Sequence, residues 1–409
     1  MSKPYHLFQG YGIELEYMIV HKDSLNVMSI ADELLKHELG IIGSDFENGV
    51  ITWSNELVLH VIEIKTTKPE SDLKLVAKEF SKNISRINTI LATWNAMLLP
   101  SAAHPLMNPF AETKLWPHDN NDVYALYDKI FNSKGHGWSN LQSTHLNLPF
   151  HGDEEFAKLH AAIRLILPLL PALCASSPIL DGKVSGMLDT RLRYYKTNQA
   201  KIPVITGKII PEEVYTHSEY KEIIYTPIVE AIEIHDPENI LDPIWVNSRG
   251  AIARFDRGSI EIRVMDIQEC SAVDVAIVNT VVEILKLLTM ERFISLDEQK
   301  KISTESLATL FDQSAITGLA TRIDNKNFMK AFDLSSSATI KEIWQHILKH
   351  IPTENYPESN RTLIQTILEQ GSLSERIIRA LEQDQSERNI LSIYQRLSVC
   401  LAENKLFIP

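Results

Sequence analysis

The chain has 409 residues, 44% of them hydrophobic, which is enough for a large core and, by length, for two or three domains. Its 53 acidic residues outnumber its 40 basic residues, so the formal net charge is −13 and the isoelectric point about 5.6. Because the sequence also has no long basic run, this balance argues against nucleic acid and against an anionic membrane as the main partner.

The first third of the chain predicts strands followed by one long helix. Residues 11–21 alternate as a strand does, and residues 49–67 predict a hairpin or two strands. Residues 71–98 predict an amphipathic helix with Ser71 as its N-cap, because apolar side chains recur at three- and four-residue intervals. Residues 99–122 contain four prolines and predict a long ordered loop, our candidate for a lid over a site.

The rest of the chain predicts mainly helices. A short strand around His145 precedes an apolar helix over residues 153–175, which its two internal prolines should kink. Residues 223–234 fit either a strand or a helix. Residues 271–290 predict another apolar helix, and from about residue 300 the pattern is nearly all helical.

This order of elements predicts an α+β fold with an antiparallel or mixed sheet. We expect a catalytic α+β domain over residues 1–300, with residues 301–409 as a helical part packed on the same domain. Intermixed strands and helices followed by helices alone are the basis for that division.

The cysteines and the apolar segments indicate in which cellular compartment the protein is expected. Cys174, Cys270 and Cys400 are far apart and lack metal-binding spacing, so they predict reduced thiols. The first ten residues have no apolar signal core, and residues 165–175 are too short to span a bilayer and contain two prolines. We therefore expect a cytoplasmic protein.

Three apolar segments carry two charges at positions i and i+2, and a fourth carries two neutral polar groups at the same spacing. The pairs are Glu14 and Glu16, Glu63 and Lys65, Glu261 and Arg263, and His145 and Asn147. In a strand these two positions point to the same face of a sheet. Each pair alone also fits a solvated sheet face, but the flanking positions are strongly apolar. Neighbouring strands would therefore collect these groups into one charged patch.

Carboxylates collected in this way predict a metal and phosphate site. Glu14 and Glu16 repel one another unless a cation lies between them, and Mg²⁺ prefers such hard oxygen ligands. Two metal ions can bridge phosphate oxygens during phosphoryl transfer. His145 fits a metal ligand, a substrate contact or a hydrogen-bonded structural residue. The basic residues that could meet phosphate are Lys65, Arg191, Arg249, Arg254, Arg257 and Arg263. The sequence contains neither a phosphate-binding P-loop motif nor a Rossmann glycine motif.

The segments that carry these residues resemble the glutamate–cysteine ligase type 2 family, also called carboxylate–amine ligases. The resemblance lies in GIELEYMIV, VIEIKTT, AAHPL, STHLNLPF, ALCASSPILDG followed by Arg191, SRGAIARFDRGSIEIRVMDIQECSAVD and, more weakly, ILEQGSLSERI. They follow the family's order over roughly residues 11–380. The resemblance implies a glutamine synthetase-like fold, in which a curved, mostly antiparallel sheet forms a funnel with helices packed outside.

The resemblance also implies a reaction and roles for the residues. Family members use ATP and Mg²⁺ (or Mn²⁺) to phosphorylate the side-chain carboxylate of glutamate, and the amine of cysteine then displaces the phosphate to give γ-glutamylcysteine. Position by position, Glu14, Glu16, Glu63 and Glu261 look like metal ligands, joined by His145, and Arg263 looks like the contact of the transferring phosphoryl group. Glu261 and Arg263 are thus the expected catalytic pair. The expected nucleotide- or substrate-binding residues are Lys65, Asn147, Arg191, Arg249, Arg254 and Arg257.

Two segments depart from the family pattern. Many members have His-x-His-Val-Gly where this chain has His145-Leu146-Asn147, and the family's basic C-terminal segment is replaced by NKNFMKAF at residues 325–332. The alternatives are a ligase for another amine or amino acid, a phosphotransferase on the same fold, and a non-catalytic binding protein. We expect small-molecule substrates, no nucleic-acid or membrane partner, and leave the oligomeric state open, a homo-oligomer included.

Overall fold

The computed structural model describes residues 4–409 and is built on one large antiparallel sheet. Its strand order is β2-β3-β4-β1-β6-β10-β9, and β5 pairs with the far end of β1. The strands are β1 (Gly12–His21), β2 (Asp45–Asn48), β3 (Ile51–Asn55), β4 (Val61–Thr66), β5 (Ala96–Leu99), β6 (Ser143–Pro149), β9 (Ala251–Arg254) and β10 (Ser259–Asp266). The α+β class predicted from the sequence is confirmed.

The side chains of β1 point alternately to an apolar face and to a charged face of the sheet. Ile13, Leu15 and Tyr17 are fully buried in the main core, so the alternate side chains, Glu14 and Glu16, project from the opposite face. Further along that second face, Met18 and Val20 enter a separate apolar cluster with the C-terminal helices α18 (Leu373–Leu381) and α19 (Glu387–Glu403). The face is therefore charged over one half of β1 and apolar over the other.

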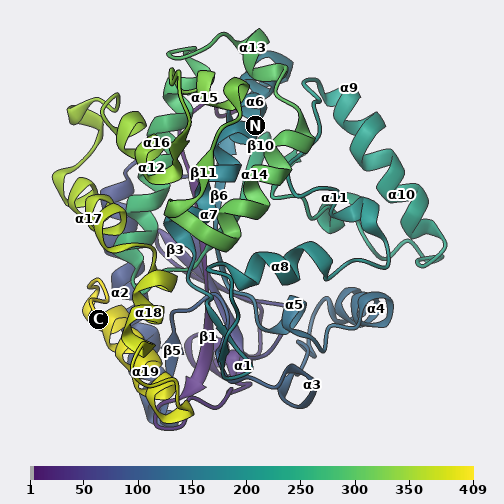
Figure 1. The fold of residues 1–409 in the computed structure, drawn as a ribbon. Helices are drawn as coiled ribbons and strands as arrows, with labels where there is room; N and C mark the ends of the chain where they lie inside the picture. The colour runs from purple at the N-terminus through teal and green to yellow at the C-terminus, as the bar shows by residue number, and fades with distance from the viewer. Residues whose placement is uncertain (1–3) are drawn as a thin grey trace.

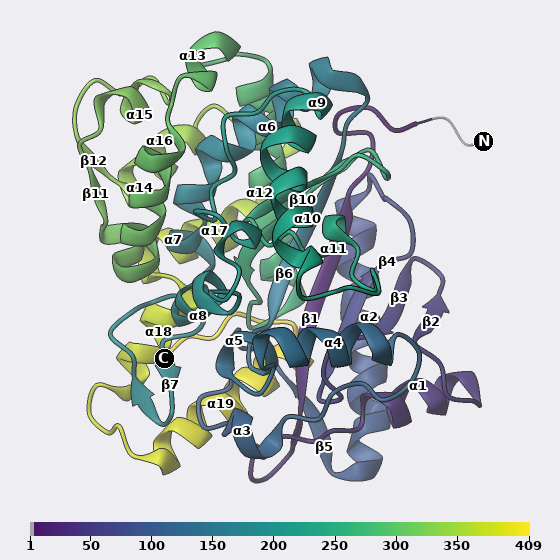
Figure 2. The same cartoon turned by 90° about the vertical axis from the view of Figure 1, so that its right-hand side faces the viewer.

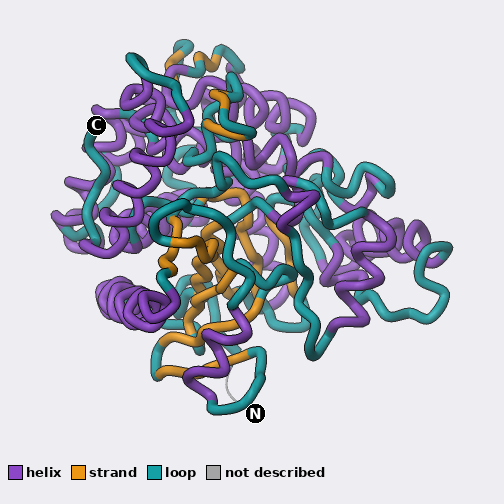
Figure 3. The backbone as a smooth tube through the Cα atoms, turned by 90° about the horizontal axis from the view of Figure 1, so that it is seen from below, coloured by secondary structure: helices purple, strands orange, loops and turns teal. Residues whose placement is uncertain are grey.

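Long helices cover the apolar face. Helix α2 (Leu73–Leu91) packs on β3, β4 and β5, and helix α12 (Ser271–Thr289) packs on both α2 and α6 (Gly152–Ile166). The strands lie at the centre of the molecule with helices around them (Figure 3). The segment Gly152–Cys174 is long and apolar enough to cross a membrane, but 94% of its most apolar window is buried inside the fold.

Short helices cover the charged face. They are α4 (Asn121–Phe131), α5 (His136–Ser139), α8 (Thr190–Thr197) and α11 (Pro243–Val246). Figure 2 shows α4, α5 and α8 lying across the sheet beside β1, with α11 above them. Each of the four contributes an aromatic or polar side chain to the cavity described below.

The remaining helices complete the fold. They include α1 (Ala31–Leu39), α3 (Pro109–Glu112), α7 (Leu170–Cys174), α9 (His217–Tyr220), α10 (Thr226–Glu233), α13 (Leu296–Lys300), α14 (Thr304–Thr317), α15 (Lys326–Lys330), α16 (Ile340–Leu348) and α17 (Glu358–Gln370). Two-stranded pairs are formed by β7 (Ile179–Leu180) with β8 (Lys183–Val184), and by β11 (Arg322–Ile323) with β12 (Ala338–Thr339). Helices α13–α16 lie on the side of the molecule away from β2–β4 (Figures 1 and 2).

The structure corrects the predicted end of the first long helix. It stops at Leu91, one 3₁₀ turn follows, and Asn95 adopts a left-handed conformation (φ 52°) that turns the chain into β5. Asp72, rather than Ser71, is the N-cap, because its carboxylate accepts hydrogen bonds from two backbone N–H groups of the first turn. The ambiguous segment 223–234 is helical, starting as a π-helical turn that runs into α10.

Candidate active site

The register of the central strands brings all four i, i+2 pairs to one patch. Glu14 lies opposite Lys65 of β4 on one side and His145 of β6 on the other. Glu16 lies opposite Glu63, and Glu261 lies opposite Asn147. Because β4, β1, β6 and β10 are consecutive in the sheet, these side chains form a continuous row on its charged face.

An acidic cluster occupies the centre of this row. Single ligand atoms of Glu14, Glu63 and His145 lie within 4.8 Å of one another. The Nδ1 of His145 is 3.0 Å from Glu14 and 3.7 Å from Glu261, and its Nε2 is 4.0 Å from Glu16. One imidazole therefore bridges carboxylates from two neighbouring strands.

Glu56 is a further carboxylate of this cluster, which our sequence reasoning missed. It lies in the turn between β3 and β4 and lines the same cavity. Burial, followed by the charges of Glu16 and Glu63, raises its pKa well above the usual value. The predicted hairpin could have pointed to Glu56, because the turn from β3 to β4 brings residue 56 close to residue 63.

The pKa values of two groups in the acidic cluster are raised above their usual values. Burial and the charge of Glu14 raise the pKa of Glu63, although Lys65 and Ser54 donate hydrogen bonds to its carboxylate. The pKa of His145 is also raised: burial opposes its charge, but the hydrogen bond to Glu14 and the charge of Glu16 outweigh burial. Binding of a metal ion to these groups would therefore displace protons into solvent.

In two of the i, i+2 pairs, the basic residue forms an ion pair with the acidic residue of the same strand. The Nε of Arg263 is 2.6 Å from Glu261, and the Nζ of Lys65 is 2.7 Å from Glu63. Although burial works against ionisation, Arg263, His145 and Arg254 together lower the pKa of Glu261 to about 2. The pKa of Glu261 is therefore shifted in the opposite direction to those of Glu56 and Glu63.

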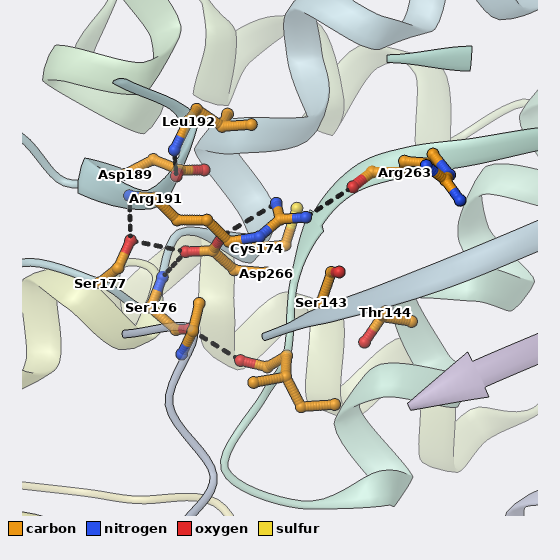
Figure 4. Close-up of polar contacts among 12 residues, drawn as sticks. Ser143, Thr144, Cys174, Ser176, Ser177, Asp189, Arg191, Leu192, Arg263 and Asp266 are labelled. Atoms are coloured by element: carbon orange, nitrogen blue, oxygen red, sulfur yellow. Dashed lines mark hydrogen bonds and ion pairs between the residues drawn. The ribbon is translucent and has the colours of Figure 1, made fainter. Parts of the chain in front are cut away.

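The other predicted binding residues divide into two groups. Arg254 and Arg257 line the cavity, and Asn147 donates a hydrogen bond to Glu14 over 3.0 Å. Arg191 reaches the cavity but is 2% exposed and already bonded to Asp266 and to the carbonyl of Arg263 (Figure 4). Arg249 is instead buried outside the cavity lining, in a bidentate pair with Glu212 at 2.6 and 2.7 Å.

The cavity has a volume of about 350 Å³ and an aromatic wall opposite the sheet. We define this aromatic wall as Tyr124, Tyr127, Trp138, Tyr195 and Trp245. The Tyr127 ring makes edge contacts with both tryptophans, at 4.7 and 5.1 Å between centroids. Sequence reasoning missed this wall because its members come from four short, separate helices. The predicted lid, residues 99–122, contributes none of the lining among residues 4–409; α4, which follows it, does.

A second cavity, of about 670 Å³, adjoins the first. Glu14, Lys65 and Arg257 line both, so the charged row continues from one cavity to the other. The second cavity is lined further by Phe150, Phe255 and the backbone around Gly258. Both cavities therefore combine charged and aromatic side chains.

Comparison with protein families places this chain in a known group. A family model described as Glutamate-cysteine ligase family 2 (GCS2) matches residues 11–395. The chain belongs to this family. It is therefore an ATP-dependent carboxylate–amine ligase, and the charged row lies on the sheet that this fold provides.

Individual relatives agree with this membership. The ligase is 31% identical over 397 residues to an uncharacterised protein of Archaeoglobus fulgidus, covering 97% of this chain and 100% of the relative. Its fold is similar to that of glutamate–cysteine ligase from Francisella tularensis in complex with AMP, with a TM-score of 0.57 and 15% identity over 97% of this chain and 90% of the other. A bifunctional glutathione synthetase from Pasteurella multocida gives a TM-score of 0.65 at 14% identity, over 97% of this chain and 53% of that one.

The cysteines of this ligase lie apart from its charged row. Cys174 and Cys270 are fully buried in the core, and burial raises the pKa of both thiols well above the usual value. A thiol held in its neutral form is a poor nucleophile. Both are free thiols, in agreement with the reduced cysteines expected from the sequence.

Proposed function

We propose that this ligase joins the side-chain carboxylate of glutamate to the amine of cysteine, through a γ-glutamyl phosphate, to form γ-glutamylcysteine. The observation that carries the proposal is the single cavity in which an acidic cluster lies next to Lys65, Arg254 and Arg263. Such a site can hold a metal–phosphate complex and a second anion, the substrate carboxylate, at the same time.

The donor set fits Mg²⁺ or Mn²⁺. The acidic cluster offers carboxylate oxygens from Glu14, Glu16, Glu56, Glu63 and Glu261 with one imidazole, and three of these residues place ligand atoms within 4.8 Å of one another. When bound, the metal would neutralise phosphate oxygens and so lower the barrier to phosphoryl transfer.

The protein's own contribution to the first step is placement. We assign the nucleotide to the second cavity, with its phosphates directed toward Lys65 and Arg257, which line both cavities. Arg263 then leaves Glu261 for the transferring phosphoryl group. A carboxylate oxygen of glutamate attacks the γ-phosphorus, the bond to the bridging oxygen breaks, and ADP leaves.

The second step is the attack of the amine on the acyl carbon. The new C–N bond forms, the C–O bond to phosphate breaks, and the departing phosphate takes up the proton lost by the amine. No side chain needs to become covalently attached to substrate. The aromatic wall excludes water from the acyl phosphate, which would otherwise hydrolyse.

A second candidate is the same chemistry with another amine. The aromatic wall favours it, because five aromatic rings present more apolar and cation-binding surface than a cysteine side chain fills. Asn198, at the edge of the cavity, also has a side-chain oxygen without a protein partner, which could accept a hydrogen bond from an amine.

Amine-stimulated ADP release tests both candidates. The ligase with ATP, Mg²⁺ and glutamate should release ADP faster when cysteine is added, and mass spectrometry should detect γ-glutamylcysteine. Stimulation by a different amine in the panel would select the second candidate. Glu261→Gln provides the inactive control, and the absence of stimulation by every amine would contradict the proposed function.

A further inference from the structure

Behind the charged row, a buried network ties the far end of β10 to helix α8. We define the Arg191 anchor as Asp189, Arg191 and Asp266, together with the hydroxyl group of Ser177. All four residues are buried, with Asp189 and Asp266 fully so. Figure 4 shows these residues joined by hydrogen bonds and an ion pair, with Arg191 reaching toward Arg263.

Asp266 is the centre of the anchor. Its carboxylate accepts hydrogen bonds from the backbone N–H of Ser176 at 2.8 Å and the hydroxyl of Ser177 at 2.9 Å, and it pairs with Arg191 at 3.4 Å. The Ser177 hydroxyl also accepts the backbone N–H of Arg191 at 3.0 Å. Asp266 therefore fixes both the backbone and the guanidinium of Arg191.

Arg191 in turn holds the peptide of Arg263. Its Nη2 donates a hydrogen bond to the Arg263 carbonyl over 2.8 Å. At this point β10 carries a β-bulge: two of its residues, Arg263 and Val264, lie opposite a single residue of β6, His145. Bulges beside active sites change the direction of a side chain, and a bulged peptide needs support from outside the ladder.

Helix α8 also reaches the Arg263 side chain. Tyr195, one turn after Arg191, lies beside the Arg263 guanidinium in the cavity wall, and the Arg191 guanidinium lies 5.7 Å from the Tyr195 ring. The carboxylate of Asp189 caps the same helix by accepting the N–H of Leu192. One short helix thus contacts both the backbone and the side chain of Arg263.

We propose that Asp266 and Asp189 are positioning residues that act through Arg191 to aim the Arg263 guanidinium at the transferring phosphoryl group. The charge state of the anchor supports this role. Burial and the neighbouring Asp266 raise the pKa of Asp189 well above its usual value, and burial raises that of Asp266 to about 6. Asp266 is the carboxylate that pairs directly with Arg191, at 3.4 Å.

A double-mutant cycle in the ADP-release assay tests the proposal, which rests on the ligase function for this readout. Asp266→Asn should lower kcat by about tenfold to a hundredfold and leave the KM values for ATP and glutamate within about twofold, since only placement is lost. In an Arg263→Ala background the same change should alter kcat by less than about twofold, because the guanidinium that Asp266 would position is already absent. An equal loss in both backgrounds, or a raised KM for glutamate with unchanged kcat, overturns the proposal.

Two further variants keep the test decisive. Ser177→Ala removes one hydroxyl of the anchor and should give a smaller, equally Arg263-dependent loss if Asp266→Asn fails to fold. Asp274→Asn is the matched control: Asp274 is as buried as Asp266 but binds Thr144 and Gln268 instead. Its effect should be the same in both backgrounds, and a coupling to Arg263 as large as that of Asp266 overturns the proposal.

Amide hydrogen exchange separates the anchor from the proposed function. Peptides that contain Arg263 should exchange faster in Asp266→Asn than in the wild-type ligase, and at the wild-type rate in Asp274→Asn. Equal exchange in wild type and Asp266→Asn overturns the anchor whatever the enzyme catalyses. Absence of amine-stimulated ADP release in the wild type, with exchange as expected, counts against the ligase substrates alone.

Discussion

The two ends of β10 carry acids with opposite roles. Glu261 faces the cavity with the acidic cluster, where Lys65 or His145 lies within 4.0 Å of Glu14, Glu16 and Glu63. Asp266, five residues later, has its charge matched by Arg191 and its oxygens bonded to Ser176 and Ser177. The difference shows that burial alone does not identify a binding site. A binding site is the place where charges remain for a ligand to complete.

The largest effect should come from the acidic cluster. Glu14→Gln removes a carboxylate that contacts both His145 and Asn147, and it should lower amine-stimulated turnover by more than about a hundredfold. Steady-state ADP release measures it, and the far-UV spectrum serves as the folding control. Turnover within threefold of wild type would remove Glu14 from the metal set.

Arg263→Lys should have the next largest effect. Lysine keeps the charge but loses the planar fork that can meet two phosphate oxygens, so kcat should fall by about a hundredfold. Arg249→Lys is a suitable control, because Arg249 is paired with Glu212 outside the cavity lining. A larger loss of kcat in Arg249→Lys than in Arg263→Lys would contradict the assignment.

Glu56→Gln should change activity and stability in opposite directions. It removes one carboxylate from the metal set, so activity at low Mg²⁺ should fall by about ten- to a hundredfold. It also removes a half-buried acid with a raised pKa, which destabilises the fold as the pH rises above the pKa of glutamate in the unfolded chain. The metal-free variant at pH 8 should therefore have a higher Tm than the wild type. A lower Tm would show that partners stabilise the Glu56 carboxylate, as Arg263 stabilises that of Glu261.

The smallest effect should come from Asp274→Asn and depend on pH. Burial raises the pKa of Asp274 to about 8, whereas an unfolded chain ionises it near its ordinary value. The wild type therefore loses stability between about pH 4 and pH 8, because the unfolded state gives up the proton first. The Tm of the variant minus that of the wild type should rise from pH 5 to pH 8. A constant difference would mean that Asp274 is ionised in the fold.

The sequence predicted the parts of this site that follow from strand geometry. The i, i+2 spacing correctly placed Glu14, Glu16, Glu63, His145 and Glu261 on one face, because alternation is a local property of strands. The assigned roles of these residues remain predictions. The α+β class likewise followed from the order of the elements.

The features of the site that were not predicted from the sequence depend on contacts between distant segments. Glu56, the aromatic wall and the Arg191 anchor come from turns and short helices that only the folded sheet brings together. The same cause explains the error at residues 92–98, where the apolar pattern of the helix runs on into β5 although Asn95 turns the chain between them. Arg249 shows the converse: an arginine near the motif pairs with Glu212, which no local pattern predicts.

The central claim is that glutamate is activated as an acyl phosphate, and transfer of oxygen tests it most directly. Glutamate labelled with ¹⁸O in its side-chain carboxylate should be incubated with the ligase, ATP, Mg²⁺ and the amine that gives the fastest ADP release. Our account predicts inorganic phosphate that carries one ¹⁸O atom, since the oxygen bonded to phosphorus leaves with it when the amine attacks carbon. Phosphate without the label, accompanied by ADP release at the same rate, would contradict it.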